Sequence, residues 1–162
     1  MGSPNVDQLS FLGSTFKKAL ENYDCDTVAL LGGATGNGLE HVNPDVTRRI
    51  TAIDINPEYL AILRQGYEGT VPGLEIVEAD LETCAIGDPA YSLIFAGLVF
   101  EYLEPRKLLS QIAGWLQAGG VMVVVLQLPA KHENMISESL SRGGQGKGLV
   151  MVSIGRRLKN RN

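Results

Sequence analysis

A glycine-rich turn and three later positions have the residue types and the spacing of a ligand-binding edge. The turn, residues 32–38, directly follows the apolar run 28–31. Asp54 ends the next apolar run, and Asp80 and Gly97 follow two later ones. Because the carboxyl ends of parallel strands line one crevice in open α/β sheets, we expect these four features to lie side by side. They predict a site for a nucleotide that carries a ribose.

The turn and the first acid have physical reasons to contact such a ligand. Gly32 and Gly36 permit backbone conformations, or close approaches of a ligand, that a side chain would forbid. The carboxylate of Asp54 can accept hydrogen bonds from both ribose hydroxyls. Because aspartate is also common in turns, Asp54 could instead cap the helix that follows.

The two later positions would complete the site. Asp80 can accept a hydrogen bond from an adenine amino group, with Ile55 and Leu81 flanking the ring. An ordinary polar loop residue is the alternative interpretation of Asp80. Gly97 has no side chain at the point where the amino-acid end of a ligand could meet the backbone carbonyl of Ala96.

Five apolar runs predict the strands that would position these residues. Most of them lack alternation, which is typical of strands covered on both faces in a parallel sheet. Apolar residues with helical spacing occur at residues 6–23, from Pro57, and from Pro105 to a stop at residues 118–120. The order predicts an α/β fold, a doubly wound, mostly parallel Rossmann-like sheet with helices on both faces. The runs are residues 27–31, 50–54, 74–79, 92–96 and 121–126.

Shorter segments complete the expected fold. Between the first two strands only residues 37–42 can be helical, because the sequence Asn-Pro-Asp at 43–45 stops the helix. Residues 133–140 favour a weaker helix and residues 149–154 one more strand, so we expect a short or atypical C-terminal edge. The first helix, residues 6–23, either only packs on the sheet or also covers the ligand-binding edge.

Length and charge limit the remaining possibilities. The 162 residues fit one domain, which we place at residues 1–142, followed at 143–162 by a glycine-rich linker, a possible edge strand and a basic tail. All 18 acidic residues precede residue 142, so nucleic-acid binding by the body is not expected. The sequence shows no transmembrane run, no signal peptide and no metal-type spacing of Cys25 and Cys84. We therefore expect a cytoplasmic protein without a metal or a membrane partner.

Five motifs together resemble class I S-adenosylmethionine-dependent methyltransferases. Residues 28–38 look like the first glycine motif of that family, and residues 52–60 are similar to its acidic second-strand motif. Residues 77–81 resemble the adenine-side motif, residues 91–103 the fourth strand with its turn, and residues 116–123 the turn into the fifth strand. As a set, these motifs are specific for the family.

The resemblance implies S-adenosylmethionine as cofactor. A small-molecule methyl acceptor is the expected partner, because no basic groove in the sequence indicates a nucleic acid. The glycine turn would wrap the methionine part, Asp54 would hold the ribose, and Ala96 with Gly97 would meet the methionine amino group. The reaction would be a direct displacement at the sulfonium methyl, which needs an aligned nucleophile and, for some acceptors, a base. Glu101 is the candidate for substrate contact or catalysis, or else a solvated helix residue. The implied cofactor-binding residues are Gly32, Gly33, Ala34, Gly36, Asn37, Asp54, Ile55, Asp80, Leu81, Ala96 and Gly97.

Two other functions fit parts of the sequence. Residues 32–38 also read G-x-x-x-G-x-G, as in short-chain dehydrogenases that use NAD(P), but no tyrosine is followed four residues later by the required lysine. The second alternative is a non-catalytic or truncated cofactor-binding scaffold. Leu30 and Ser92 stand where many methyltransferases have an acid, and Ala34 replaces a glycine.

Overall fold

A mostly parallel sheet organises the chain. The computed structural model describes residues 4–32, 38–85, 90–97, 99, 104–127, 141–142 and 149–155. The strands, in the order β3-β2-β1-β4-β5-β7-β6, are parallel from β3 to β5, whereas β7 runs antiparallel to β5 and β6 antiparallel to β7. The bounds are β1 Thr27–Leu31, β2 Arg49–Asp54, β3 Leu74–Glu78, β4 Tyr91–Gly97, β5 Leu116–Gln127, β6 Ser141–Arg142 and β7 Leu149–Gly155.

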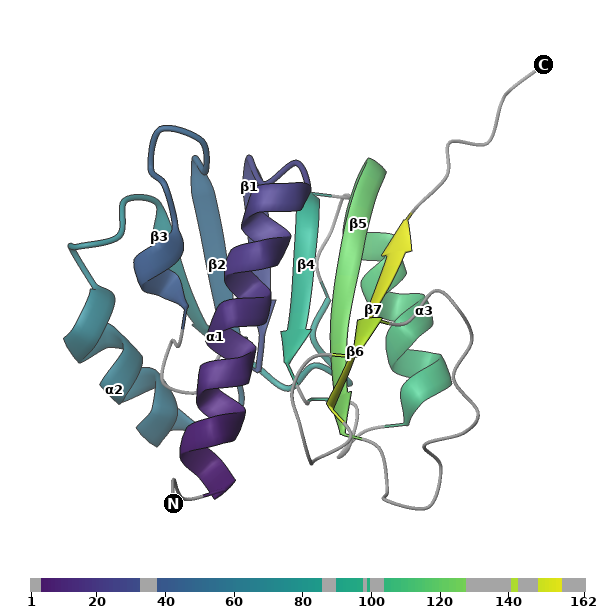
Figure 1. The fold of residues 1–162 in the computed structure, drawn as a ribbon, viewed down its shortest axis with the longest axis horizontal. Helices are drawn as coiled ribbons and strands as arrows, with labels where there is room; N and C mark the ends of the chain where they lie inside the picture. The colour runs from purple at the N-terminus through teal and green to yellow at the C-terminus, as the bar shows by residue number, and fades with distance from the viewer. Residues whose placement is uncertain are drawn as a thin grey trace.

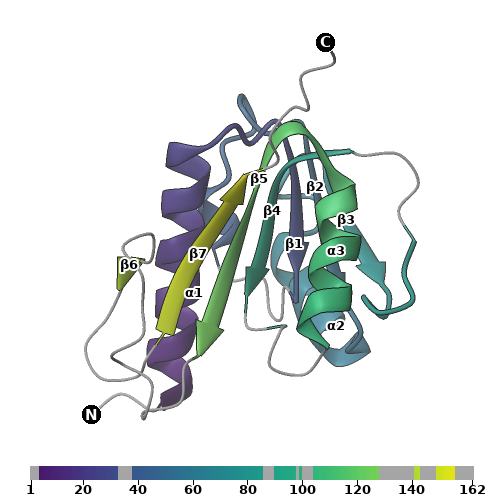
Figure 2. The ribbon, with the colours of Figure 1, turned by 90° about the vertical axis from the view of Figure 1, so that its right-hand side faces the viewer.

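Helices cover both faces of this sheet, which confirms the predicted doubly wound fold. Figures 1 and 2 show α1 (Pro4–Asn22) on one face and α3 (Pro105–Trp115) on the other. The helix α2 (Pro57–Tyr67) shares the face of α1, because Leu63 and Phe16 belong to one apolar cluster. The strand order reverses between β1 and β4, the position at which such folds bind their ligands. No helix among the described residues is long and apolar enough to cross a bilayer.

The central strand β1 shows why its apolar run does not alternate. Val28 and Leu30 pack into the cluster that α1 covers, whereas Ala29 and Leu31 pack into the cluster under α3. All four side chains are at most 4% exposed. Successive side chains of a strand point to opposite faces, so a strand that is buried on both faces needs apolar residues at every position.

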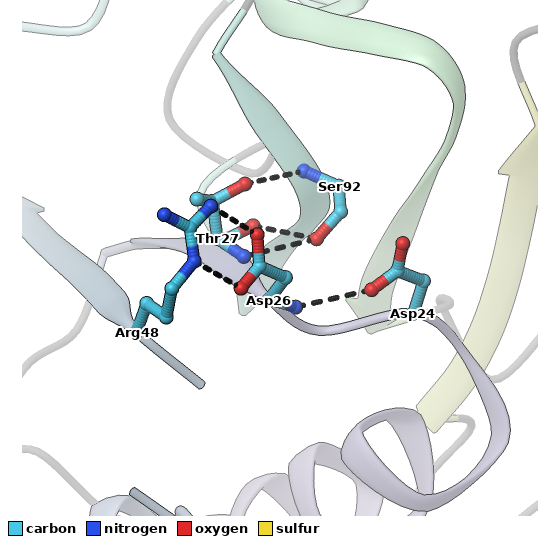
Figure 3. A network of polar contacts seen from close by, with 5 residues as sticks. All are labelled: Asp24, Asp26, Thr27, Arg48 and Ser92. Atoms are coloured by element: carbon cyan, nitrogen blue, oxygen red, sulfur yellow. Dashed lines mark hydrogen bonds and ion pairs between the residues drawn. The ribbon is translucent and has the colours of Figure 1, made fainter. Parts of the chain in front are cut away.

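Polar side chains fix the amino ends of β1 and β4 (Figure 3). The hydroxyl of Ser92 accepts from the backbone N–H of Thr27 at 3.1 Å and donates to its carbonyl at 3.0 Å, while the backbone N–H of Ser92 donates to the Thr27 hydroxyl at 3.1 Å. Nearby, the guanidinium of Arg48 binds both carboxylate oxygens of Asp26. These contacts lie at the end of the sheet opposite to the strand tips that carry Gly97 and Asp54.

The end of the third main helix differs from the prediction. We expected residues 118–120 to stop it, but α3 ends at Trp115, and Leu116 already pairs with Tyr91 in the sheet. The two strands then shift register between Tyr91 and Leu93. Gly120 occupies this irregularity, where a Cβ atom would lie 2.9 Å from the carbonyl oxygen of Tyr91. The glycine therefore permits a close approach of two strands instead of ending a helix.

The predictions for the first crossover and for the C-terminal segments are confirmed in part. Of the helix expected at residues 37–42, the structure has the single 3-10 turn η1 (Leu39–His41), and residue 37 lies outside the described residues. The expected last strand exists as β7, and its short partner β6 was missed. The helix predicted at residues 133–140 lies outside the described residues.

Candidate functional site

A pocket of about 380 Å³ lies at the carboxyl ends of the parallel strands. Its volume is in the range of cavities that bind small molecules and cofactors. The residues come from α1, the ends of β1 to β4, and the start of α2. They are Gln8, Leu9, Leu12, Gly32, Ile53, Asp54, Ile55, Tyr59, Ala79, Asp80, Leu81, Gly97 and Val99.

The structure brings together six of the residues predicted to bind a cofactor. Gly32, Asp54, Ile55, Asp80, Leu81 and Gly97 all line this pocket. A second hollow of about 250 Å³, between the C-terminal half of α1 and residues 43–47, contains none of the predicted residues. The strand-tip pocket is therefore the candidate site.

The glycine turn begins in a conformation that requires glycine. Gly32 has φ +64°, and a Cβ atom there would lie 2.3 Å from a methyl carbon of Val99. Its backbone N–H donates to the carbonyl of Ile53 at 2.9 Å, which ties the start of the turn to the end of β2. A side chain at position 32 would both strain the backbone and fill the pocket.

The carboxylate of Asp54 is oriented by the backbone that follows it. Its Oδ1 atom accepts from the N–H of Asn56 at 2.9 Å, and the Asn56 side chain in turn caps α2 by accepting from the N–H of Glu58. The predicted capping role at this helix therefore belongs to Asn56. Asp54 is half-buried and lines the pocket.

Asp80 is held in the same manner on the neighbouring strand. Its Oδ1 atom accepts from the N–H of Glu82 at 2.9 Å, and its carbonyl accepts from the N–H of Cys84 at 2.7 Å. The side chain of Gln111 on α3 donates to the carbonyl of Cys84, which anchors this turn to the helix. Both acids of the pocket thus sit where a strand ends in a tight turn, a geometry that restricts their rotamers.

The pocket wall also contains residues for which no binding role was predicted. Leu9 and Leu12 come from the first helix, which was expected either only to pack on the sheet or also to cover the ligand-binding edge. The structure shows that it does both. Leu12 packs against the core, lines the pocket, and would contact a Cβ atom at Gly97 at 3.2 Å. Gln8 and Tyr59 were missed. Tyr59 lies in the first turn of α2 and lines the pocket together with Ile55, which precedes that helix.

Some predicted positions are elsewhere or outside the described residues. Ala96 is fully buried in the core and its side chain does not line the pocket. Leu30, at a position where an acid is common, lies in the apolar cluster with Phe16. The predicted positions Gly33, Ala34, Gly36, Asn37 and Glu101 lie outside the described residues.

The far end of the glycine turn is held by Glu40. Its Oε2 atom accepts from the backbone N–H of Gly38 at 3.0 Å and from the hydroxyl of Tyr67 on α2 at 3.2 Å. Burial raises the pKa of Glu40, but the hydrogen bonds from the backbone N–H groups of Glu40 and Gly38 and from Tyr67, with attraction to His41, together lower it. Burial and the nearby Glu40 carboxylate raise the pKa of Tyr67. Glu40 is therefore ionised at neutral pH.

The charge of the pocket is negative. Among the lining residues that the structure describes, Asp54 and Asp80 are the charged ones, and none is basic. Ile55, which is 64% exposed, and the phenol ring of Tyr59 provide apolar surface beside these acids. Such a pocket suits a ligand with a hydroxylated sugar, a flat apolar ring and a positive charge.

Comparison with known families shows which family the chain belongs to. The model of a family described as "Methyltransferase domain" matches residues 30–124, more than half of the chain. The chain belongs to this family. The matched segment of this methyltransferase-domain chain contains most of the pocket, from Gly32 to Val99, and the family predicted from the motifs is confirmed.

Solved structures agree on the fold of the methyltransferase-domain chain. The N-methyltransferase NodS from Bradyrhizobium japonicum WM9 matches with a TM-score of 0.70 at 14% identity, over 95% of this chain and 97% of NodS. NodS in complex with S-adenosyl-L-homocysteine matches with a TM-score of 0.68 at 16% identity, over 93% of this chain and 86% of that one. YcgJ from Bacillus subtilis matches with a TM-score of 0.64 at 15% identity, over 76% of this chain. The chain spans 53% of the length of YcgJ. No curated protein matches the chain.

Proposed function

We propose that the chain binds S-adenosylmethionine in the strand-tip pocket and transfers its methyl group to a small-molecule acceptor. The observation that carries this proposal is the convergence of six predicted cofactor-binding residues on one pocket, in a chain of the methyltransferase domain family. The complex of NodS with S-adenosyl-L-homocysteine, a protein of similar fold, supports the same cofactor.

The described residues fit this cofactor. The Asp54 carboxylate would accept from the ribose hydroxyls, and Asp80 from the adenine amino group. Ile55 and Leu81 would contact the adenine ring, and Gly32 leaves room for the methionine part. Gly97 and the backbone carbonyl of Ala96 would meet the amino group of the methionine part.

The protein contributes mainly alignment to such a reaction. When bound, S-adenosylmethionine supplies an electrophilic methyl group on a sulfonium centre. The carboxylates of Asp54 and Asp80 and the wall of Leu9 and Leu12 would fix the orientation of the adenosine and exclude water from one side. Holding two reactants in one orientation is sufficient to accelerate a displacement that needs little other chemistry.

The acceptor that this pocket favours is neutral or cationic. Two carboxylates and no basic side chain among the described lining residues would repel an anion. Glu101 stays a prediction for substrate contact. We also propose a binding domain at residues 1–142, followed at 143–162 by a glycine-rich linker, an edge strand and a basic tail. A cytoplasmic location is proposed as well, and the free thiols of Cys25 and Cys84 support it.

A calorimetric titration tests the cofactor. We expect S-adenosylhomocysteine and S-adenosylmethionine to bind with a stoichiometry of one, and NAD not to bind. Binding of NAD alone would favour the dehydrogenase alternative. Binding of none of the three would favour a scaffold without a cofactor and would overturn the proposed function. At present no observation favours either alternative.

A further inference from the structure

Both ends of the glycine turn are tied to the scaffold, but by different means. At the start, the N–H of Gly32 bonds the carbonyl of Ile53 within the sheet. At the other end, Gly38 has φ +98°, and a Cβ atom there would lie 2.8 Å from the ring of Phe16 on α1. Gly38 is thus seated against α1, and its N–H donates to the carboxylate of Glu40.

Glu40 connects this end of the turn to α2. The residue follows Gly38 in the turn η1 and reaches back to its N–H, as acids at the start of helices do. The same oxygen accepts from the hydroxyl of Tyr67 at the end of α2, and the other oxygen lies 3.7 Å from Nε2 of His41. Tyr67 and His41 therefore hold the Glu40 carboxylate in the orientation in which it accepts from the N–H of Gly38.

The exposure of Glu40 argues against a purely structural role. Its side chain is 56% exposed, and exposed polar pairs add little to the stability of a fold. The core beneath it, formed by Leu39, Phe16 and their neighbours, is apolar and does not need this carboxylate. What the carboxylate does fix is the orientation of one backbone N–H at the end of the ligand-binding turn.

We propose that Glu40, oriented by Tyr67, is a positioning residue for the cofactor, because it fixes the Gly38 end of the glycine turn. This inference rests on the proposed function. A turn that is already held in its binding conformation loses less conformational entropy when a ligand binds. Glu40 would thus increase cofactor affinity without touching the cofactor.

Variants of Glu40 separate this role from simple stabilisation. In Glu40→Ala we expect an affinity for S-adenosylhomocysteine about three- to tenfold weaker, the effect of one lost hydrogen bond. Glu40→Gln keeps an acceptor and should recover part of the loss, and Tyr67→Phe should lose less than Glu40→Ala. If the acceptor is known, the KM for the cofactor should rise while kcat stays unchanged. Glu21→Gln is the matched control, because Glu21 is an exposed acid of α1 that pairs with Lys17.

A second readout does not depend on the cofactor. Amide hydrogen exchange at Gly38 should become several-fold faster in Glu40→Ala and stay unchanged in Glu21→Gln, with the thermal midpoint within a few degrees of the wild type. Unchanged exchange at Gly38 in Glu40→Ala, or wild-type affinity in that variant, would overturn the role of Glu40 and leave the proposed function standing. If the wild-type chain fails to bind S-adenosylhomocysteine, the proposed function fails, and the role of Glu40 toward the cofactor fails with it.

Discussion

Asp54 offers the most direct test of the candidate site. The substitution Asp54→Asn keeps the shape of the side chain and one oxygen. That oxygen can still accept from the N–H of Asn56, which the wild-type Oδ1 atom does at 2.9 Å. The turn into α2 should therefore survive, while the negative charge and the second acceptor are lost. The variant thus removes the feature that a ribose diol requires and leaves the fold in place.

The expected loss follows from the strength of one charge-assisted hydrogen bond. Such a bond contributes about 1.5–3 kcal/mol, so the dissociation constant for S-adenosylhomocysteine should rise about 10- to 100-fold. Isothermal titration calorimetry measures it, with the thermal midpoint as the check on folding. Glu78→Gln is the matched control. Glu78 is opposite Asp54 in the register of β2 and β3, and it does not line the pocket. Affinity within twofold of the wild type in Asp54→Asn, or an equal loss in Glu78→Gln, would refute the assignment.

Two further predictions concern the stability of the fold, one beside the pocket and one at the opposite end of the sheet. Gly32→Ala places a methyl group 2.3 Å from a carbon of Val99 in a left-handed backbone, so it should lower the free energy of unfolding by more than Gly69→Ala, which has φ +80° but nothing within 4 Å. Urea unfolding should give a loss of about 1–2 kcal/mol for Gly69→Ala and a larger one for Gly32→Ala, and equal losses would contradict the described contact. Ser92→Ala leaves the part-buried N–H of Thr27 without its hydroxyl partner and should cost about 1–3 kcal/mol of stability. Because this contact lies at the opposite end of the sheet, affinity for S-adenosylhomocysteine should not change, and a parallel loss of affinity would show that the two ends are coupled.

The parts of the fold that local chemistry determines were predictable. The central strands β1 and β4 follow from nearly continuous apolar runs, since burial on both faces favours apolar residues at successive positions. The edge strand β3 instead has exposed glutamates at Glu75 and Glu78 and follows from its alternation. The start of α2 at Pro57 was predicted, and the structure shows Asn56 as its cap, bonded to the N–H of Glu58. The positions of Gly32, Asp54 and Asp80 at one edge follow from the parallel order alone.

Other features depend on contacts between distant residues and were not predictable. The helix α3 ends at Trp115 because Leu116 pairs with Tyr91, a partner that no local pattern of Gly119 or Gly120 reveals. The short strand β6 exists only through its pairing with β7. The pocket residues of α1 were recognisable as an apolar stripe, but that stripe does not tell which turn of the helix reaches the strand tips.

The position of β7 has a consequence for solubility. The strand pairs with β5 from Val121 to Gln127 and so satisfies backbone groups along an apolar strand of the sheet. A chain shortened before residue 149 would leave those N–H and C=O groups open, beside the buried side chains of Met122, Val123, Val124 and Val125. Open apolar edges recruit strands from other molecules. By covering this edge, β7 reduces aggregation. Residues 149–155 should therefore be retained when the protein is produced for the experiments above.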